Sequence, residues 1–333
     1  MIEVSWSRCG GEDCVRVGGA GPDARVQVHP RTAVTVGDPP PTAGRLVRDG
    51  DDVCFLPRFA FLDGTTYMVV VGGAEAVALV RPRPDRPSTT EVLDILPSAR
   101  EVPRNLLRLY VRFSAPMREG CAAAHIGLVD DAGHELAGAL LPTEYELWDA
   151  GRCRLTVLLD PARIKRGLVP NRQAGYPLRF GSSFRVVVDD GFRDARGDPL
   201  RQGAERGYQV GGDERRRVEP EDWIVTVPSS DTVEPLEIGF TRALDHALLG
   251  RCLRVVGPDG RSVDGRQDVG PEERSWRLAP LAPWAPGPHR LVVDPTLEDL
   301  AGNSVQRVFD RDLTRPDDQP REAGPVEVTF RPR

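Results

Sequence analysis

Short stretches in which apolar and polar residues alternate occur along the whole chain. In residues 107–113, apolar side chains alternate with Arg108, Tyr110 and Arg112. The same alternation occurs in three further segments, 153–159, 236–240 and 326–330. A period of two residues places the apolar side chains on one face of a β-strand and the polar side chains on the other. Strands with one dry and one wet face are typical of antiparallel sheets that pack face to face, so the pattern predicts β-sandwiches.

The sequence also repeats itself, which indicates several copies of one structural unit. Residues 291–305 match residues 186–200, and three pairs of residues are equivalent: Asp189 and Asp294, Asp194 and Asp299, Gly197 and Gly302. Residues 240–244 match residues 113–117 at a larger offset. The earlier copy therefore carries an insertion, which we place in the Gly-, Pro- and Arg-rich run at about 167–182.

A third copy lies near the N-terminus and shows only the second half of the pattern. Residues 55–71 match residues 278–294, with three equivalent pairs: Pro57 and Pro280, Phe61 and Trp284, Gly64 and Gly287. A chain of 333 residues is long enough for two or three domains. The 34 glycines and 31 prolines favour short strands joined by tight turns. We therefore expect an all-β protein of three tandem antiparallel β-sandwich domains, at 1–85, at 86–212 with the insertion, and at 218–333 with an extra C-terminal strand.

Two segments have the composition of connections between domains. Residues 81–90 are rich in proline, which predicts an extended and fairly stiff connector. Residues 211–221 contain three consecutive arginines among acidic residues, which predicts a solvated joint. Both segments are expected to be open to proteases. The polar tail at 314–325 leads into one more strand pattern, which we expect to pair with an open sheet edge.

The copies share a series of motifs in a fixed order. They are a strand that runs into Phe-[Ser/Thr]-x-[Pro/Ala]-[Met/Leu], a hairpin with Asp-x-x-Gly, a Pro-x-x-x-[Trp/Phe]-x-x-Gly turn, a Val-Val-Asp strand and an Asp-x-x-Gly-[Asn/Asp] loop. This order resembles the immunoglobulin-like domain of bacterial surface-layer and other envelope proteins. The resemblance covers most of Glu91 to Leu313 in two copies and, more weakly, the first 80 residues.

Three longer segments extend the resemblance. NLLRLYVRFSAPM, WDAGRCRLTVLLDPARIKRGL and LEDLAGN are similar to segments of a set of uncharacterised bacterial proteins built on this module. The resemblance implies three tandem immunoglobulin-like sandwiches and a non-catalytic binding or scaffolding role associated with the bacterial envelope. It implies no particular reaction.

The location of the protein stays open at this point. Proteins of the kind it resembles are commonly exported, but the chain begins Met-Ile-Glu-Val-Ser-Trp, without the basic and apolar regions of a signal peptide. The protein is extracytoplasmic if a signal peptide has been removed, and cytoplasmic otherwise. No apolar run approaches the ~20 residues of a membrane-spanning helix, so we expect no membrane-spanning segment.

The charge distribution argues against nucleic acid as a partner. The formal net charge is −6, and of the 44 basic residues only Lys165 is a lysine. The arginines are scattered among aspartates and glutamates, without the basic stripe that contacts to a phosphate backbone require. An abundance of arginine of this kind is more typical of a codon bias than of a phosphate-binding surface.

No catalytic residues can be assigned from sequence motifs. The five histidines are dispersed without metal-ligand spacing: His29, His125, His134, His246 and His289. No Gly-x-Ser-x-Gly motif occurs, which disfavours a hydrolase of that type. An enzyme with its active site on the loops of the middle domain remains an alternative.

The six cysteines do not decide the compartment. Cys54, Cys153 and Cys252 lie in apolar strand patterns and are most simply explained as buried thiols. Cys9 and Cys14 flank a Gly-Gly-Glu-Asp turn and can close a small disulfide loop if the protein is exported.

The aspartate-containing loops of the repeat are candidates for Ca²⁺, which prefers carboxylate and carbonyl oxygens on flexible loops. The C-terminal copy offers Asp294, Asp299 and Asn303. The simpler interpretation is a turn in which an aspartate side chain accepts backbone N–H groups and a glycine follows at positive φ. We favour the turn and predict no metal site.

One cluster of residues in the middle domain is our candidate ligand-binding patch: Trp148, Asp149, Arg163, Lys165 and Arg166. A lysine is retained there in a chain that otherwise uses arginine, and the two cations differ in geometry. An anionic ligand or an acidic strip on a partner protein suits such a patch. A carbohydrate is the other possibility we consider, with Trp148 and Trp223 as platforms for stacking.

Overall fold

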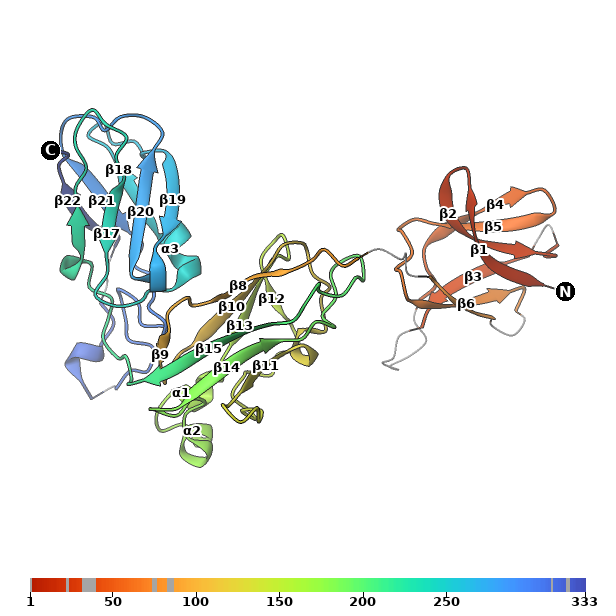
Figure 1. Ribbon diagram of the computed structural model, residues 1–333, viewed down its shortest axis with the longest axis horizontal. Coiled ribbons are helices and arrows are strands. Elements are labelled where there is room, and N and C mark those ends of the chain that lie inside the picture. Colours follow the sequence, from red (N-terminus) through yellow and green to blue (C-terminus); the bar gives the residue numbers. More distant parts are fainter. Residues whose placement is uncertain are drawn as a thin grey trace. The chain divides into compact units, whose positions relative to one another are not determined.

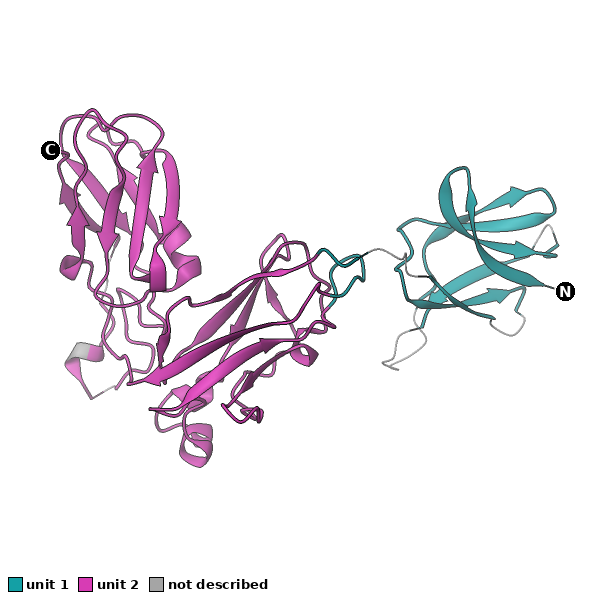
Figure 2. Ribbon diagram, viewed as in Figure 1, with its two compact units in different colours: residues 1–89, 193–199 teal, residues 90–192, 200–333 magenta. Residues whose placement is uncertain are grey.

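A computed structural model describes residues 2–21, 24–31, 40–73, 77–82, 87–312, 314–321 and 324–333. Residues 83–86 of the predicted proline-rich connector lie outside the described residues. The chain divides into two compact units, one of residues 1–89 with 193–199 and one of residues 90–192 with 200–333 (Figure 2).

The first sandwich consists of two sheets, in the strand orders β1-β2-β5-β4 and β3-β6-β7 (Figure 1). Its strands are β1 Glu3–Cys9, β2 Glu12–Gly18, β3 Val26–Pro30, β4 Gly44–Asp49, β5 Asp52–Pro57, β6 Thr66–Val71 and β7 Val77–Val80. Alternate residues such as Val15, Val17 and Val69 point between the sheets and are fully buried.

The second sandwich has the strand orders β12-β13-β10-β8 and β11-β14-β15-β9. Its strands are β8 Val92–Leu96, β9 Glu101–Pro103, β10 Arg108–Phe113, β11 Ile126–Val129, β12 Leu147–Trp148, β13 Arg154–Leu158, β14 Ser183–Val188 and β15 Ala204–Gly211. Every pair of strands is antiparallel except β15 with β9, which is parallel. Its short helices are η1 Ala122–Ala124, α1 Pro161–Ile164 and α2 Val169–Ala174.

The third sandwich has the strand orders β16-β17-β20-β19 and β18-β21-β22. Its strands are β16 Ile224–Thr226, β17 Leu236–Gly239, β18 Leu253–Val256, β19 Gly265–Val269, β20 Ser275–Pro280, β21 His289–Val293 and β22 Val326–Phe330. Its helices are η2 Pro220–Asp222, α3 His246–Cys252, η3 Pro271–Glu273 and η4 Pro316–Asp318. The last strand, β22, pairs with β21 at the edge of the smaller sheet and is part of the sandwich itself, not a strand added to it.

The strand order identifies all three sandwiches as immunoglobulin-like. If the strands of one domain are lettered A to G in chain order, the first and third domains have the sheets A-B-E-D and C-F-G. The second domain has the same order, with β9 as an eighth strand that extends the C-F-G sheet beside β15. This is the topology of the constant-type immunoglobulin domain. The expectation of an all-β chain of tandem immunoglobulin-like sandwiches is therefore confirmed, and the finer domain boundaries stay a prediction.

The internal repeat is visible in individual hydrogen bonds. The N–H of Leu136 donates to Leu128 O at 2.8 Å, and in the third sandwich the N–H of Val263 donates to Val255 O at 2.8 Å. The hairpins that precede these bonds turn at Gly133 with φ 85° and at the matching glycine 260 with φ 80°. Only glycine takes such a φ readily, which explains why these residues stand out in the sequence repeat.

The second sandwich departs from the third in two places. Residues 159–182 connect β13 to β14, whereas only residues 281–288 connect β20 to β21. This longer connection contains α1 and α2 and includes the run at 167–182 in which we placed the insertion. The second difference lies at the D strand, where β12 has two residues and β19 has five.

The second and third sandwiches belong to one compact unit, and buried polar contacts join them. Glu273, which has no exposed surface, accepts the N–H of Ser98 at 2.8 Å. Tyr110 donates its hydroxyl hydrogen to Asp245 at 2.7 Å. The N–H of residue 107 donates to the carbonyl oxygen of residue 300 at 2.9 Å. Buried polar groups that are all paired hold a fixed arrangement, because breaking one bond strands its partner away from water.

The charged segment between these sandwiches is not the solvated joint that its composition predicts. Glu214 exchanges hydrogen bonds with the side chain of Asn105, at 2.7 and 3.0 Å. Burial alone raises the pKa of Glu214, but hydrogen bonds from Arg216 and the charge of Arg242 hold it below its usual value. Val218 is buried. Arg215 and Arg217 bind an acid and a carbonyl of the protein, whereas Arg216 pairs with Glu214 at the surface.

Limited proteolysis tests this arrangement. We expect cleavage within residues 82–89 and a protected fragment that contains residues 90–333, because the joint at 213–219 is held by hydrogen bonds and ion pairs to both of its neighbours. Mass spectrometry of the digest identifies the fragments. Early cleavage between Asp213 and Glu219 would contradict the rigid joint and restore the sequence-based expectation.

Asp299 gives the joint a pH dependence. Burial raises the pKa of Asp299 to about 6 despite the nearby Arg242, from an ordinary value of 3.8. The folded state thus holds this proton more tightly than the unfolded state does. The contribution to the free energy of unfolding is complete below pH ~4 and is lost as the pH rises through 6, a change of ~3 kcal/mol at most.

We expect urea unfolding of the protein to show greater stability at pH 5 than at pH 7.5. Asp299→Asn lowers stability at both values, because the amide nitrogen cannot accept hydrogen bonds from Arg242 or Asn303. The substitution also reduces the difference between the two pH values. An unchanged difference in the variant would assign the pH dependence to other groups, of which the half-buried Glu298, whose pKa is also raised by burial, is the first to examine.

Candidate functional site

A break in one strand ladder opens the side of the second sandwich. On β13, Leu158 accepts the N–H of Leu141 at 2.9 Å, and Thr156 pairs with Leu147. Only Val157 lies between these two contacts. On the opposite side of the ladder, residues 142–146 lie between the same two contacts. A regular ladder would place one residue there, so the extra residues bulge out of the sheet.

The bulge encloses a cavity of about 630 Å³ between the edge strands of the two sheets. Its apolar lining comes from β13, from β11 and from the bulged segment with its approach: Leu155, Val157, Ile126, Leu128, Leu140 and Leu147. Within residues 87–312, all of which are described, no arginine, lysine, histidine or aromatic side chain lines the cavity. A concave apolar site of this volume is typical of a binding pocket for a small molecule or a side chain.

Glu146 fastens one end of the bulge. One carboxylate oxygen accepts the N–H of Ala122 at 2.6 Å, and the other accepts the indole N–H of Trp148 at 2.6 Å. Trp148 in turn packs beside Phe113 and Phe192, with ring centroids 5.9 and 6.2 Å away. The bulge is thereby tied both to η1 and to the aromatic edge of the core.

Arg163 holds the segment that leads into the bulge. Its guanidinium donates to Gly138 O at 2.7 Å, on the cavity wall, and to Tyr176 O at 2.9 Å, in the long connection before β14. It also donates to the carbonyl oxygens of residues 137, 174 and 175. One arginine therefore holds the cavity wall against the insertion, because its fork of donors satisfies several carbonyls at once.

Three backbone groups of β11 face away from β14 without a partner. The carbonyl of His125 accepts the N–H of Asp189 at 2.8 Å, so residues 125, 127 and 129 face β14, and Ile126 and Leu128 face away from it. The carbonyl of Leu128 accepts the N–H of Leu136. Within the fully described stretch 87–312, the N–H and C=O of Ile126 and the N–H of Leu128 have no hydrogen-bond partner.

The charged residues at the cavity are all acidic. They are Glu135, Glu144 and Glu146. The carboxylate of Glu146 is already occupied by two N–H donors. Glu135 and Glu144 are exposed, and neither carboxylate has a hydrogen-bond or ion-pair partner in the described part of the chain. The mouth of the apolar cavity therefore carries a negative charge that no arginine neutralises.

The five residues of the predicted patch do not form one surface. Trp148 and Asp149 lie where β12 turns into β13, whereas Arg163, Lys165 and Arg166 follow the opposite end of β13 (Figure 1). Asp149 accepts the N–H groups of residues 153 and 154 and stabilises the hairpin. The sequence placed these residues close together in the chain, but the strand between them separates the two groups in space.

Lys165 and Arg166 face the third sandwich. The ammonium of Lys165 lies 4.6 Å from the centroid of the Phe309 ring. The guanidinium of Arg166 donates to Asp310 at 2.8 Å. These contacts join the end of α1 to the joint between the sandwiches. Binding of an anionic ligand by Lys165 and Arg166 stays a prediction, and such a ligand would compete with their partners within the protein.

The aspartate loops have the geometry of turns. Asp194 Oδ1 accepts the N–H of Asp198 at 3.0 Å, and Asp299 Oδ1 accepts the N–H of Asn303 at 2.9 Å. The glycines that follow these aspartates, 197 and 302, have φ of 87° and 78°. The second oxygen of Asp299 accepts from Arg242 and from the Asn303 amide. Within the described ranges, no three side chains of the metal-binding types gather into a metal site.

Calcium binding at Asp294, Asp299 and Asn303 is tested by thermal unfolding with and without a chelator. We expect the same melting temperature in excess Ca²⁺ and in EDTA, because protein donors already occupy the oxygens of Asp299. A ligand that binds only the folded state would raise the melting temperature by mass action. A rise of several degrees with Ca²⁺, absent with Mg²⁺, would contradict the turn interpretation.

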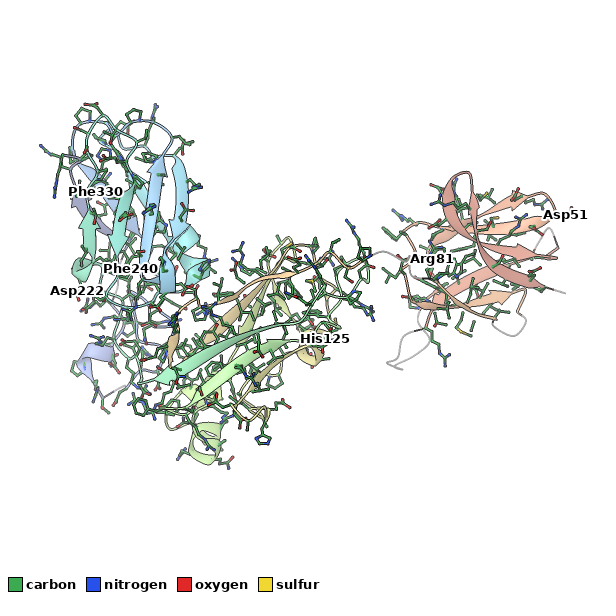
Figure 3. The ribbon with its side chains drawn as sticks, in the orientation of Figure 1. Asp51, Arg81, His125, Asp222, Phe240 and Phe330 are labelled. Atoms are coloured by element: carbon green, nitrogen blue, oxygen red, sulfur yellow. The ribbon has the colours of Figure 1, made fainter. Side chains whose placement is uncertain are left out.

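The other candidate residues have structural surroundings. Trp223 is buried against Phe240, with ring centroids 4.8 Å apart, so its proposed role as an exposed stacking platform is wrong. Figure 3 shows Phe240 in the third sandwich and His125 in the second. His125 contacts Asp189 at 3.0 Å and stacks on Phe192.

No disulfide bond joins any two of the six cysteines, all of which lie in the described part of the chain. Cys14 and Cys54 are fully buried, and burial raises the pKa of the Cys54 thiol to about 12, which disfavours a reactive thiolate. No helix among the described residues is both long enough and apolar enough to span a membrane.

Comparisons with known proteins add little to the geometry. No protein-family model matches the chain, and no curated protein sequence matches it. Native alpha-2-macroglobulin from Escherichia coli is similar over 73% of this chain and 71% of its own, with 12% identity and a TM-score of 0.25. A three-domain titin structure is similar over 99% and 92%, with 8% identity and a TM-score of 0.20. TM-scores this low carry no functional argument, and the immunoglobulin-like assignment rests on the strand order.

A surface glycan-binding protein is also among the similar structures. It belongs to the mixed-linkage glucan utilisation locus of Bacteroides ovatus and was solved with a heptasaccharide. The similarity covers 96% of this chain and 63% of that one, with 10% identity and a TM-score of 0.20. This likeness is likewise too weak to transfer a ligand.

Proposed function

We propose that the protein is a non-catalytic binding protein whose ligand site is the cavity of the second sandwich. The observation that supports this proposal is an apolar cavity of about 630 Å³, built by a bulge that the third sandwich lacks. Glu146 fastens the end of the bulge and Arg163 holds the segment that leads into it, so hydrogen bonds hold the cavity wall in place. A pre-formed site of this kind binds without a large cost in ordering the protein.

Two alternatives have less support. An enzyme needs a nucleophile and a base positioned for each other, and the polar side chains that line the cavity are three glutamates and two threonines. Among the described residues no hydrogen bond links one of these glutamates to either threonine. A carbohydrate site relies on exposed aromatic rings as platforms, and no aromatic ring lines this cavity. Association with the bacterial envelope rests on the resemblance of the repeat to surface-layer domains, and detection of the native protein in cell fractions tests it.

The cavity itself is tested with Nile red, a neutral apolar dye that fluoresces on leaving water. We expect saturable binding at one site of the full chain, and at least tenfold weaker binding to Val157→Trp, because the larger side chain fills the cavity. Thr226→Trp places the same indole on exposed β16 of the third sandwich and serves as the control. Circular dichroism and thermal unfolding confirm that each variant folds. Equal dye binding by the folded Val157→Trp variant would refute the cavity as the site.

A further inference from the structure

The open edge of β11 and the cavity beside it together define a class of ligand. We propose that the second sandwich binds an extended peptide that adds a strand to β11, places an apolar side chain in the cavity and directs a neighbouring basic side chain to Glu135 and Glu144. This inference rests on the proposed function and names the ligand of that same cavity.

The backbone of β11 supplies the pairing groups. The N–H and C=O of Ile126 and the N–H of Leu128 point away from β14 and are free. An unpaired strand edge is a template for another strand, and main-chain hydrogen bonds then provide affinity that does not depend on sequence. A compact apolar molecule has no row of donors and acceptors to match these groups, so the open edge favours a peptide.

The cavity supplies selectivity for side chains. Ile126 and Leu128 belong both to the free edge and to the cavity lining, so a strand paired with β11 runs along the cavity mouth. Successive side chains of an extended peptide point to opposite faces, so every second one can enter the cavity. The lining includes Leu155, which is buried, and Val157, which is half-buried, and such a lining favours an aliphatic side chain.

The negative charge at the cavity mouth favours basic side chains at the peptide positions between those that enter the cavity. Glu135 and Glu144 have no partner within the described residues, although elsewhere the arginines of this chain pair with most nearby acids, as Arg112 does with Asp94 at 2.8 Å. A carboxylate beside an apolar surface attracts a cation more strongly than one surrounded by water, because the effective dielectric constant is lower. An arginine or lysine of the peptide completes these pairs.

The third sandwich shows what this site requires. There β19 pairs all of its residues with β20, from Gly265 with Pro280 to Val269 with Trp276, and no bulge opens the ladder. The strand of the third sandwich that corresponds to β11 is β18. It lies beside an uninterrupted ladder, whereas β11 lies beside a cavity. The site therefore depends on the extra residues that precede the short D strand of the second sandwich.

The test uses the full chain and capped synthetic octapeptides in which leucine alternates with arginine. We expect the arginine peptide to bind, and the version with glutamate in place of arginine to bind at least tenfold more weakly. The amide hydrogens of Ile126 and Leu128 are expected to exchange more slowly in the complex. Binding without slower exchange at these two amides would overturn strand addition.

Two further comparisons separate strand pairing from general adhesion. In one peptide the backbone nitrogens of the leucines are methylated, and in a second peptide the backbone nitrogens of the arginines are methylated. These two changes remove backbone donors from opposite edges of the peptide. Only one of these two peptides is expected to lose affinity, since only one edge faces β11. Equal effects of the two methylations would overturn the proposal.

The acidic rim is tested with the double variant Glu135→Gln and Glu144→Gln. We expect tenfold weaker binding of the arginine peptide, with unchanged binding of Nile red. Glu221→Gln, an exposed acid of the third sandwich, is the matched control and should change neither. Nile red binding without binding of any peptide overturns this inference and leaves the cavity as a site for apolar small molecules. Failure of both probes would remove the proposed function as well.

Discussion

The second sandwich depends on how the open side between its two sheets is covered. In an immunoglobulin-like fold the C and D strands are both edges on that side, and the D strand normally shields the apolar interior by continuing the ladder. Here the ladder along β13 is interrupted opposite Val157, and the surplus residues arch away. Packing lost around a cavity costs stability. Glu146 binds the end of the arch to η1, and Arg163 binds the segment before the arch to the insertion, and these contacts support the opening.

The joint between the second and third sandwiches has a different physical basis. It contains charged groups, which are expensive to remove from water unless every one finds a partner. Glu273 receives backbone N–H groups from residues 98 and 99, and Asp245 receives the hydroxyl of Tyr110. Partners of this kind are specific in direction as well as in charge, so they fix one arrangement of the two sandwiches. The cavity is thus carried by a larger rigid body than a single immunoglobulin-like domain.

The candidate residues taken from the sequence have supporting roles. Trp148 orients Glu146, and Arg163 holds the cavity wall, so these two residues do belong to the site, although as its scaffold. Lys165 and Arg166 belong to the joint instead. The sequence signal for the cavity was the mismatch in spacing between the copies, part of which comes from the region before β13. The sequence pattern places the whole insertion at residues 167–182, because a run rich in glycine and proline stands out by its composition. Extra residues of ordinary composition do not stand out in this way.

The sequence by itself determined the fold class, the repeat and the turns. Three local effects produce these patterns: the alternation of a strand with a period of two, a glycine at positive φ, and an aspartate side chain that accepts backbone N–H groups of the same turn. Each of them recurs at a fixed spacing in the sequence. The tertiary structure alone decided which charges are solvated and which are buried, since residues 213–218 read as a linker until their partners at Asn105, Arg104 and Asp310 are known. It alone also decided that Ile126 has an open backbone edge beside a cavity. Both properties depend on contacts between distant segments, which no local pattern records.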